Sequence, residues 1–334
     1  MKEMIRSNWF IYTVSLIVVM VIAVQFIHVR AKGKEPVSEE PEDSTWIAPS
    51  LFADQTTIGR DRELVMYGEE LVANTAKYLG PHGSVLQITN GMNCQNCHLD
   101  AGKRPWGNNY GAVYSTYPKF RARSGTVENI YKRVNDCFER SLNGKPLDTA
   151  SREMQAIYAY MKWLGQDVPK GKKPYGSGLP KLPYLNRAAD SEKGKVVYTS
   201  VCQTCHGPNG QGVLNPDGKT YGYPPLWGEH SYNDGAGLYR LSRFASYVKY
   251  NMPFNQVSFI HPKLTDEEAW DVAAFVNSQP RPHKDQYADW KDVAQKSVDE
   301  PFGPYTDGFS ERQHKYGPYK PIEEKRKANK QTKP

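Results

Sequence analysis

The sequence predicts an all-α protein of two tandem domains, each of about 100 residues, preceded by an N-terminal transmembrane helix. Three observations lead to this fold class. A Cys-x-x-Cys-His motif occurs twice, at 94–98 and 202–206. Amphipathic helical patterns lie before and after each copy. A stretch rich in proline and glycine separates the copies, so we expect one compact domain around each motif.

The repeated motif is typical of covalent haem c attachment, in which two thiols bond the porphyrin and the imidazole ligates the iron. The residues concerned are Cys94, Cys97 and His98 in the first copy and Cys202, Cys205 and His206 in the second. Structural zinc is the alternative, but it needs four ligands and neither copy has a local fourth. A redox cysteine pair would not require the histidine. The sequence therefore predicts two haem c groups with His98 and His206 as iron ligands.

The N-terminal segment predicts membrane attachment. Residues 8–29 carry no charge if His28 is neutral, and at about 1.5 Å per residue a helix of this length spans roughly 33 Å. No clear cleavage site follows, so we expect an uncleaved anchor rather than a signal peptide. The flanking Lys and Arg residues mildly favour the opposite orientation. Because haem c is attached outside the bacterial cytoplasm, we nevertheless place the body on the outer face of the cytoplasmic membrane, where nucleic acid is not an expected partner.

Composition divides the chain into six segments. They are a membrane anchor (1–30), a polar tether (31–57), a first cytochrome c domain (58–168), a linker with four prolines (169–185), a second cytochrome c domain (186–284) and an extended basic tail (285–334). Within this tail, residues 311–334 carry eight Lys or Arg against three acids. This excess is typical of a solvated segment, and attraction to anionic lipid is the functional alternative.

The two domains look like an internal repeat of the class I cytochrome c type. Each begins with an amphipathic stretch that contains one glycine, Gly68 or Gly194. Each closes with a predicted helix, over 151–164 in the first and 265–277 in the second, where Thr265 and Glu268 form a capping box. We expect the apolar faces of these helices to pack against haem and neighbouring helices.

Alignment of the two repeats suggests the second axial ligand of each haem. In the second domain Met252 lies between the haem motif and the terminal helix, and Pro253 keeps its loop extended. Cys137 occupies the matching loop position in the first domain. Met154 and Met161 are rivals, but both fall inside the predicted terminal helix. We therefore predict Met252 and Cys137 as iron ligands.

Several further motifs carry a family resemblance. They are Tyr117–Gly125, Arg133–Gly144, Pro224–Gly228, Asn233–Gly237, Asn251–Pro253 and Tyr316–Ile322. With the two haem motifs, in this order, they resemble the thiosulfate dehydrogenase family of dihaem cytochromes over residues 58–322. The predicted anchor departs from the soluble, exported members of that family.

This resemblance implies that two thiosulfate ions are joined into tetrathionate with release of two electrons, or the reverse. It implies that the first haem, with His98 and Cys137 as ligands, is the active site, and that the second, with His206 and Met252, passes electrons outward. Thiolate ligation stabilises ferric iron and methionine raises the potential, so electrons should run from the first haem to the second.

The resemblance also places Arg123, Arg133 and Ser141 around the active site. Two dianions about 5 Å apart repel by roughly 3 kcal/mol even in water, and guanidinium groups suit sulfonate oxygens. Arg133 could instead be solvated, or pair with Glu139 or a haem propionate. Three further arginines, Arg121, Arg140 and Arg152, are weaker candidates.

Cys137 could do more than ligate iron. As a nucleophile it could carry the sulfane sulfur of one thiosulfate until the second attacks; a purely ligating role is the alternative. Some family members have a lysine before the methionine, which can compete for the second iron. Here that residue is Asn251, although Lys249 lies nearby.

Two other functions stay open on the sequence. A membrane-anchored dihaem electron carrier would explain the anchor and both haem motifs but would not need Cys137. A Sox-type cytochrome subunit also uses a cysteine-ligated haem but requires a partner subunit. For the thiosulfate enzyme we expect the electron acceptor to be a small cytochrome, a membrane oxidase or a quinone-linked complex.

Overall fold

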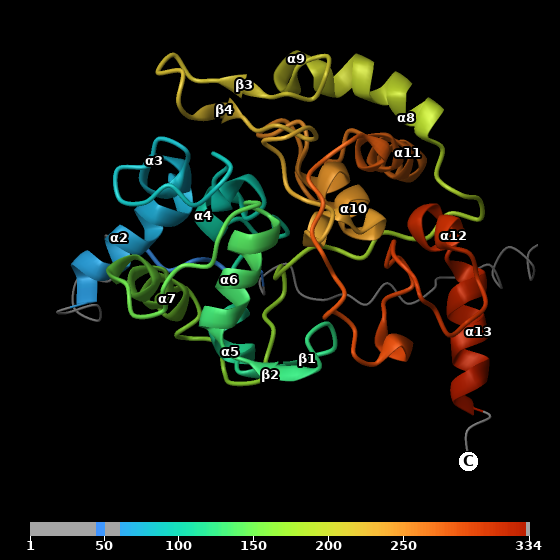
Figure 1. Cartoon of the computed structure of the whole chain (residues 1–334), viewed down its shortest axis with the longest axis horizontal. Coiled ribbons are helices and arrows are strands. Elements are labelled where there is room, and N and C mark those ends of the chain that lie inside the picture. The colour runs from blue at the N-terminus through green and yellow to red at the C-terminus, as the bar shows by residue number, and fades with distance from the viewer. Residues whose placement is uncertain (1–44, 51–60, 332–334) are drawn as a thin grey trace, which may run out of the picture. The chain divides into compact units, whose positions relative to one another are not determined.

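A computed structural model describes residues 45–50 and 61–331 (Figure 1). The predicted anchor and most of the predicted tether lie outside the described residues. Within the described ranges, no helix combines the length and apolar character needed to cross a membrane.

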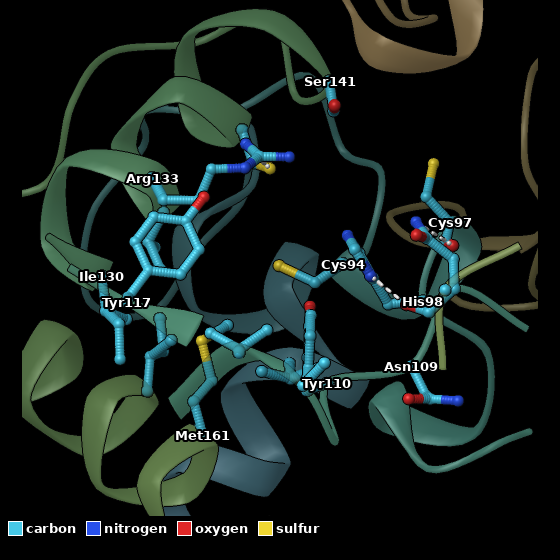
Figure 2. A pocket seen from close by; sticks show the side chains of 18 of the residues that line it. Cys94, Cys97, His98, Asn109, Tyr110, Tyr117, Ile130, Arg133, Ser141 and Met161 are labelled. Carbon is cyan, nitrogen blue, oxygen red and sulfur yellow. Dashed lines mark hydrogen bonds between the residues drawn. The ribbon is translucent and has the colours of Figure 1, made fainter. Parts of the chain in front are cut away.

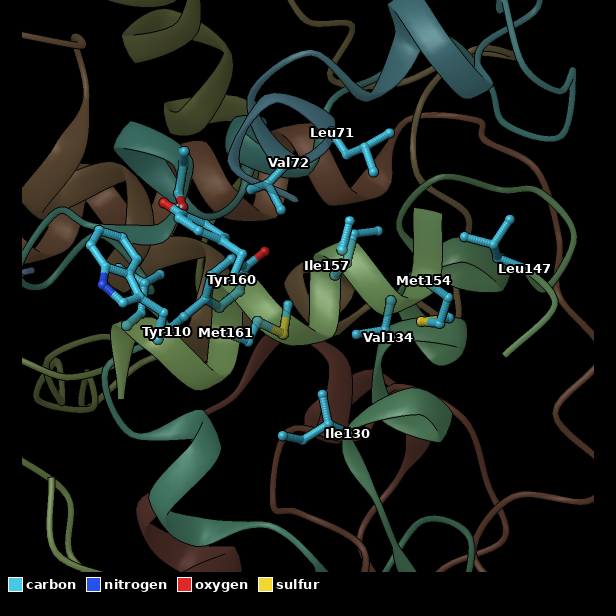
Figure 3. Close-up of a cluster of buried hydrophobic side chains, with 14 of the residues drawn as sticks. Leu71, Val72, Tyr110, Ile130, Val134, Leu147, Met154, Ile157, Tyr160 and Met161 are labelled. Carbon is cyan, nitrogen blue, oxygen red and sulfur yellow. Dashed lines mark hydrogen bonds between the residues drawn. The ribbon is translucent and has the colours of Figure 1, made fainter. Parts of the chain in front are cut away.

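The first domain is built from helices around the first haem motif (Figure 1). They are α2 (Arg62–Ala73), α3 (Thr75–Leu79), η3 (Cys94–Asn96), α4 (Leu99–Gly102), α5 (Val113–Thr116), α6 (Ile130–Arg140) and α7 (Arg152–Leu164). The predicted terminal helix is confirmed as α7, with the Ser151 side chain accepting a hydrogen bond from the Met154 amide as its N-cap. Figure 3 shows its buried face, where Ile157, Tyr160 and Met161 lie among the core side chains.

The second domain repeats this plan. Its helices are α8 (Ser191–Val197), η4 (Tyr198–Cys202), α9 (Gln203–His206), η5 (Gly237–Tyr239), α10 (Leu241–Asn251) and α11 (Asp266–Ser278). The predicted capping box of Thr265 and Glu268 is confirmed at the start of α11. Trp270, one of its buried residues, donates a hydrogen bond to the carbonyl of Pro183.

One glycine in each domain permits a close helix crossing. A Cβ on Gly68 of α2 would lie 2.0 Å from the carbonyl oxygen of Ala156 in α7. A Cβ on Gly194 of α8 would lie 1.9 Å from the carbonyl oxygen of Asp271 in α11. No side chain fits at these distances, so the opening and terminal helices of each domain meet backbone to backbone.

Two short antiparallel hairpins depart from the all-α expectation. In the first domain β1 (Lys119–Arg121) pairs with β2 (Thr126–Glu128), and in the second β3 (Val213–Leu214) pairs with β4 (Tyr221–Tyr223). The first hairpin turns through Gly125 at φ +66°, a conformation that suits glycine. Its turn also contains Arg123, so the hairpin positions a predicted site residue.

The C-terminal tail is folded against the second domain, whereas the sequence predicts an extended segment. It contains η6 (Val293–Gln295), α12 (Glu311–Tyr316) and α13 (Lys320–Gln331). His314 is fully buried, and its Nε2 lies 3.0 Å from a carboxylate oxygen of Asp307. Arg326 of α13 donates to the other oxygen of Asp307 at 2.7 Å. A buried polar cluster of this kind requires a defined tail conformation, because each group depends on its partners.

Hydrogen bonds join the two cytochrome domains and the linker. Tyr247 of α10 donates to the carbonyl of Asn96 in the first haem motif at 2.6 Å. Asn251 donates to the carbonyl of Trp106 at 3.1 Å. The linker contributes the carbonyl of Gly176, which accepts from the amide of Trp106 at 2.7 Å. These bonds are made close to the haem motifs, so the domains contact each other beside the predicted site.

Candidate active site

The histidine of each haem motif is oriented by a backbone carbonyl. Nδ1 of His98 lies 2.6 Å from the carbonyl oxygen of Asn108, and Nδ1 of His206 lies 2.8 Å from that of Pro224. A carbonyl only accepts, so each Nδ1 carries the proton and each Nε2 keeps a free lone pair. Burial lowers the pKa of His98 to about 4 and also lowers the pKa of His206. Both imidazoles are therefore neutral, as metal ligation requires.

The first haem motif opens onto a cavity of about 280 Å³. Figure 2 shows Cys97 and His98 on one side of it and Tyr117 and Arg133 on the opposite side. Burial raises the pKa of Cys94 to about 11 and that of Cys97 to about 12. Neutral sulfur is thus favoured at both positions, and a thioether to a porphyrin provides it. The apolar walls and the free Nε2 of His98 fit a haem c here.

Helix α6 carries the predicted ligand Cys137, which the sequence placed on a loop. The helix begins after Asn129, whose side chain accepts a hydrogen bond from the Lys132 amide. Phe138 is buried in the core, which fixes the face that Cys137 presents to the cavity. The cysteine therefore stands on a rigid element with little freedom to move.

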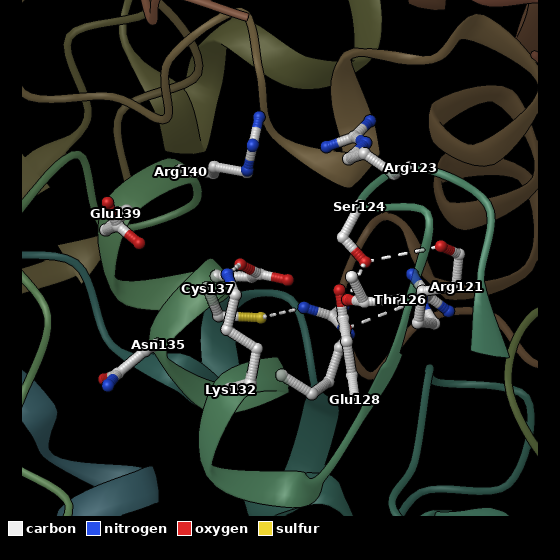
Figure 4. A network of polar contacts seen from close by, with 12 residues as sticks. Arg121, Arg123, Ser124, Thr126, Glu128, Lys132, Asn135, Cys137, Glu139 and Arg140 are labelled. Atoms are coloured by element: carbon white, nitrogen blue, oxygen red, sulfur yellow. Dashed lines mark hydrogen bonds and ion pairs between the residues drawn. The ribbon is translucent and has the colours of Figure 1, made fainter. Parts of the chain in front are cut away.

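Arg133 lies one turn before Cys137 and donates a hydrogen bond from Nη1 to Sγ at 3.0 Å (Figure 4). The neighbouring Cys137 side chain raises the pKa of Arg133, against the opposing effect of burial. Arg133 does not pair with Glu139, whose carboxylate accepts from Lys284 at 3.2 Å. The guanidinium thus stands beside the sulfur as a fixed positive charge.

Ser141 and one of the rival methionines share the cavity with Cys137. Ser141 follows α6 directly and its side chain lines the cavity. Met161 of α7 lines it as well, with its thioether visible in Figure 2, whereas Met154 is fully buried and is absent from the lining. The structure therefore brings Ser141, Arg133 and Cys137 together, and their catalytic roles stay predictions.

Arg123 lies in the same region, but its guanidinium is bound to the second domain and to the tail. It donates to the carbonyl of Gly235 at 2.8 Å. Its nitrogens also lie 3.8 Å from a carboxylate oxygen of Asp289 and 3.9 Å from one of Glu300. Figure 4 shows Arg123 and Arg140 turned away from Cys137, and Arg140 pairs with Asp289 at 2.8 Å.

A second cavity, of about 400 Å³, adjoins the first and is also lined by Cys137. Arginines from both domains line it: Arg121, Arg123, Arg133, Arg140, Arg240 and Arg243. Trp290 of the tail lines it too, at the unusual φ of +60°. Such strain in a bulky residue often marks a functional site. The last candidate of the sequence, Arg152, lies elsewhere, against the ring of Tyr67.

Sequence reasoning missed Arg240, Arg243 and Trp290, because they lie more than a hundred residues from Cys137 along the chain. Nothing in the local sequence around a single arginine on an expected core helix shows which cavity its side chain lines. The one available sign was the resemblance of the segment Asn233–Gly237, which now proves to contact Arg123.

Around the second haem motif, Met252 directly follows α10 as its C-cap residue, in extended conformation. It is half-buried against the second core cluster. Asn251 is buried and donates to backbone carbonyls, while Lys249 forms an ion pair with Asp266. Lys249 is therefore engaged by a carboxylate of its own domain.

Both domains match known families. Residues 86–169 match the SoxA/TsdA cytochrome c domain, and residues 191–280 match cytochrome c. A thiosulfate dehydrogenase of Allochromatium vinosum is 40% identical over 258 residues, which are 75% of this chain and 90% of that protein. A thiosulfate dehydrogenase of Psychrobacter arcticus is 39% identical over 240 residues, covering 71% of this chain and 70% of the relative.

The chain belongs to the thiosulfate dehydrogenase family. A solved structure agrees: thiosulfate dehydrogenase (TsdBA) from Marichromatium purpuratum superposes with a TM-score of 0.65 at 32% identity over 72% of this chain. This chain spans half of that longer protein. Members of the family are dihaem c-type cytochromes, and the two matched cytochrome c domains, each with its oriented histidine, hold the two haem c groups of this chain.

Proposed function

We propose that this protein oxidises thiosulfate, joining two thiosulfate ions into tetrathionate at Cys137, and that the reaction is reversible. The observation that carries the proposal is the hydrogen bond of 3.0 Å between Arg133 and the Cys137 sulfur in an arginine-lined cavity. Family membership supports thiosulfate as the substrate. An ordinary electron carrier would need neither the thiolate nor the arginines.

The steps assigned to Cys137 balance in atoms and charge. Its thiolate bonds to the sulfane sulfur of one thiosulfate, which forms Cys–S–S–SO3⁻ and releases two electrons. A second thiosulfate then attacks that sulfane sulfur, which forms tetrathionate and returns the thiolate. The two haem c groups, when bound, each accept one electron and pass it to an external acceptor. Arg133 stabilises the thiolate through a charge-assisted hydrogen bond before and after the reaction.

The predicted axial ligands belong to the same proposal. His98 and Cys137 would hold the iron of the first haem, and His206 and Met252 that of the second. The orientation of both histidines supports this assignment. Cys137 at the first haem would stabilise ferric iron and Met252 at the second would raise the potential, so the bound haems would supply electron transfer from the first to the second and on to a small cytochrome, an oxidase or a quinone-linked complex.

We propose further that residues 8–29 anchor the protein as a single helix in the cytoplasmic membrane, with the catalytic body on the outer face. The apolar segment and the export that haem attachment requires support this location. If so, the full chain should sediment with membranes and resist a carbonate wash, whereas a chain lacking residues 1–34 should not. Recovery of the full chain in the wash would contradict the anchor.

The decisive test of the activity uses purified protein with ferricyanide and thiosulfate. Tetrathionate should form, and thiosulfate should convert the ferric haem spectrum to the ferrous one. The Cys137→Gly variant should lose both effects while its second haem is still reduced by ascorbate. Full turnover in that variant would exclude Cys137 as the sulfur carrier.

A further inference from the structure

The arginines of the second cavity differ in whether their guanidinium groups are hydrogen-bonded. Four of the guanidinium groups are held by a hydrogen bond: Arg123 donates to the carbonyl of Gly235, Arg140 to Asp289, Arg240 to Asp299, and Arg133 to the sulfur of Cys137. A buried guanidinium with such a partner is held in place and is partly neutralised. The four hydrogen-bonded arginines therefore form the wall of the cavity and are less available to bind a further anion.

Arg121 and Arg243 are the two that remain. The Arg121 side chain makes no hydrogen bond within the described residues; its ion-pair partner is an oxygen of Glu128 at 3.9 Å, and the side chain is 37% exposed. Arg243 is exposed as well, and within residues 45–50 and 61–331 its side chain makes neither a hydrogen bond nor an ion pair, although its backbone amide donates to the carbonyl of Arg240. Both line the cavity that contains Cys137.

These two positive charges come from different domains and face the same space. Arg121 ends β1 of the first domain, while Arg243 stands in the first turn of α10 in the second. Desolvation by the surrounding protein lowers the pKa of Arg243, and the charges of Arg240 and, less strongly, Arg121 lower it further, against the opposing charge of Asp299. Like charges held together at a cavity wall are unfavourable until an anion lies between them.

We propose that Arg121 and Arg243 form a two-domain clamp for the sulfonate group of the second thiosulfate, the ion that attacks the sulfur bound to Cys137. This inference rests on the proposed function and adds a second oxyanion subsite to it. Two guanidinium forks can bind the three oxygens of a sulfonate from opposite sides. Because one fork comes from each domain, the subsite is complete only when the domains are in contact.

Steady-state kinetics and calorimetry on the purified dihaem protein test the clamp. In the Arg243→Gln variant the KM for thiosulfate should rise about tenfold or more, as expected for loss of a charge-assisted hydrogen bond, with little change in kcat. Arg243→Lys should recover part of this loss. Arg312→Gln is the matched control, because it removes the same charge from an exposed site on α12.

Sulfate, a dianion that is neither oxidised nor reduced here, provides a readout that needs no turnover. The wild-type protein should bind sulfate in a calorimetric titration, and Arg243→Gln should weaken this binding about tenfold. Unchanged KM and sulfate affinity in that variant would overturn the clamp, as would a wild-type protein that binds no sulfate. A shifted haem potential with unchanged KM would assign Arg243 to a haem propionate instead.

The two proposals fail separately. If the wild-type protein forms no tetrathionate, the proposed activity is wrong, but sulfate binding that depends on Arg243 would still establish the oxyanion site. If tetrathionate forms and Arg243→Gln behaves like wild type in both assays, the activity stands and the clamp is wrong.

Discussion

Arg133 provides the Cys137 sulfur with a charged hydrogen-bond donor inside the protein. A buried charge without a partner is costly, and the guanidinium places a full positive charge 3.0 Å from the sulfur. The two side chains can meet because residues four apart lie on the same face of a helix, here α6. The sequence alone left Arg133 open between solvent, Glu139 and a propionate, because it does not show which face of the helix lies inward.

Replacing Arg133 with glutamine should lower kcat/KM for thiosulfate by about ten- to a hundredfold, the usual effect of losing a hydrogen bond to a charged group. Lys132→Gln is the matched control, since it removes the same charge from the neighbouring, exposed position on α6. Steady-state oxidation with ferricyanide measures both. Equal losses in the two variants would mean that only general charge matters and that the contact with Cys137 does not.

At the scale of elements, the terminal helices were predictable because their signals are local. Thr265 caps α11 in the predicted capping box, α7 begins after Ser151, where the sequence placed the start of its pattern, and the apolar spacing marks the buried faces. The two hairpins were missed because strands of two or three residues are too short to show alternation. Cys137 was expected on a loop because the matching Met252 lies just beyond its helix, whereas α6 continues through Cys137.

The two glycine crossings give matched stability predictions. Gly68→Ala and Gly194→Ala should each destabilise their domain by about 1–3 kcal/mol or more, because the added methyl forces the paired backbones apart. Gly237→Ala is the control: no atom lies within 4 Å of a Cβ there and its φ is not positive. Urea unfolding followed by circular dichroism measures all three variants. Wild-type stability in Gly68→Ala would contradict the close crossing.

Helix α6 is also completed by the second domain. Asn233 donates from Nδ2 to the carbonyl of Glu139 at 2.8 Å, and its amide donates to the carbonyl of Arg140 at 3.1 Å. The last carbonyls of a helix have no partners within it. Asn233→Ala should therefore cost about 1–3 kcal/mol, the penalty for an unsatisfied buried group. Retention of the wild-type midpoint in urea would argue that water replaces the side chain without loss.

At the scale of the whole molecule, the cavity beside Cys137 is assembled from parts that are distant along the chain. The hairpin and α6 of the first domain and α10 of the second supply the arginines, and the tail supplies three carboxylates, Asp289, Asp299 and Glu300. The sequence marked residues 311–334 as basic and solvated, and composition did not show that acidic residues earlier in the tail are buried. Asp289, Asp299 and Glu300 prove to lie against the cavity's arginines.

Asp299 provides the clearest test of this arrangement. Its carboxylate accepts from Arg240 at 2.9 Å and from the Ser242 amide at 3.2 Å. Burial alone would raise the pKa of Asp299, but Arg240 and Ser242 outweigh burial and hold it below the ordinary value. The pairing therefore stabilises the fold above the ordinary aspartate pKa of about 3.9, and this stability is lost as pH falls through the lower, folded-state value.

Asp299→Asn should cost about 3–5 kcal/mol at neutral pH, because it leaves the buried Arg240 charge unpaired. The difference from wild type should begin to shrink as pH falls below about 4, where the carboxylate of the unfolded chain takes up a proton, and should continue to shrink until pH passes the lower pKa of the folded state. Urea unfolding across pH 3–8 measures this, with Asp285→Asn as the control, since that aspartate is exposed in the same tail. A deficit independent of pH would mean that the substitution disturbs packing alone and that the tail does not balance the arginines by charge. If the deficit follows protonation as predicted and the KM for thiosulfate rises with it, the tail is an electrostatic part of the substrate cavity.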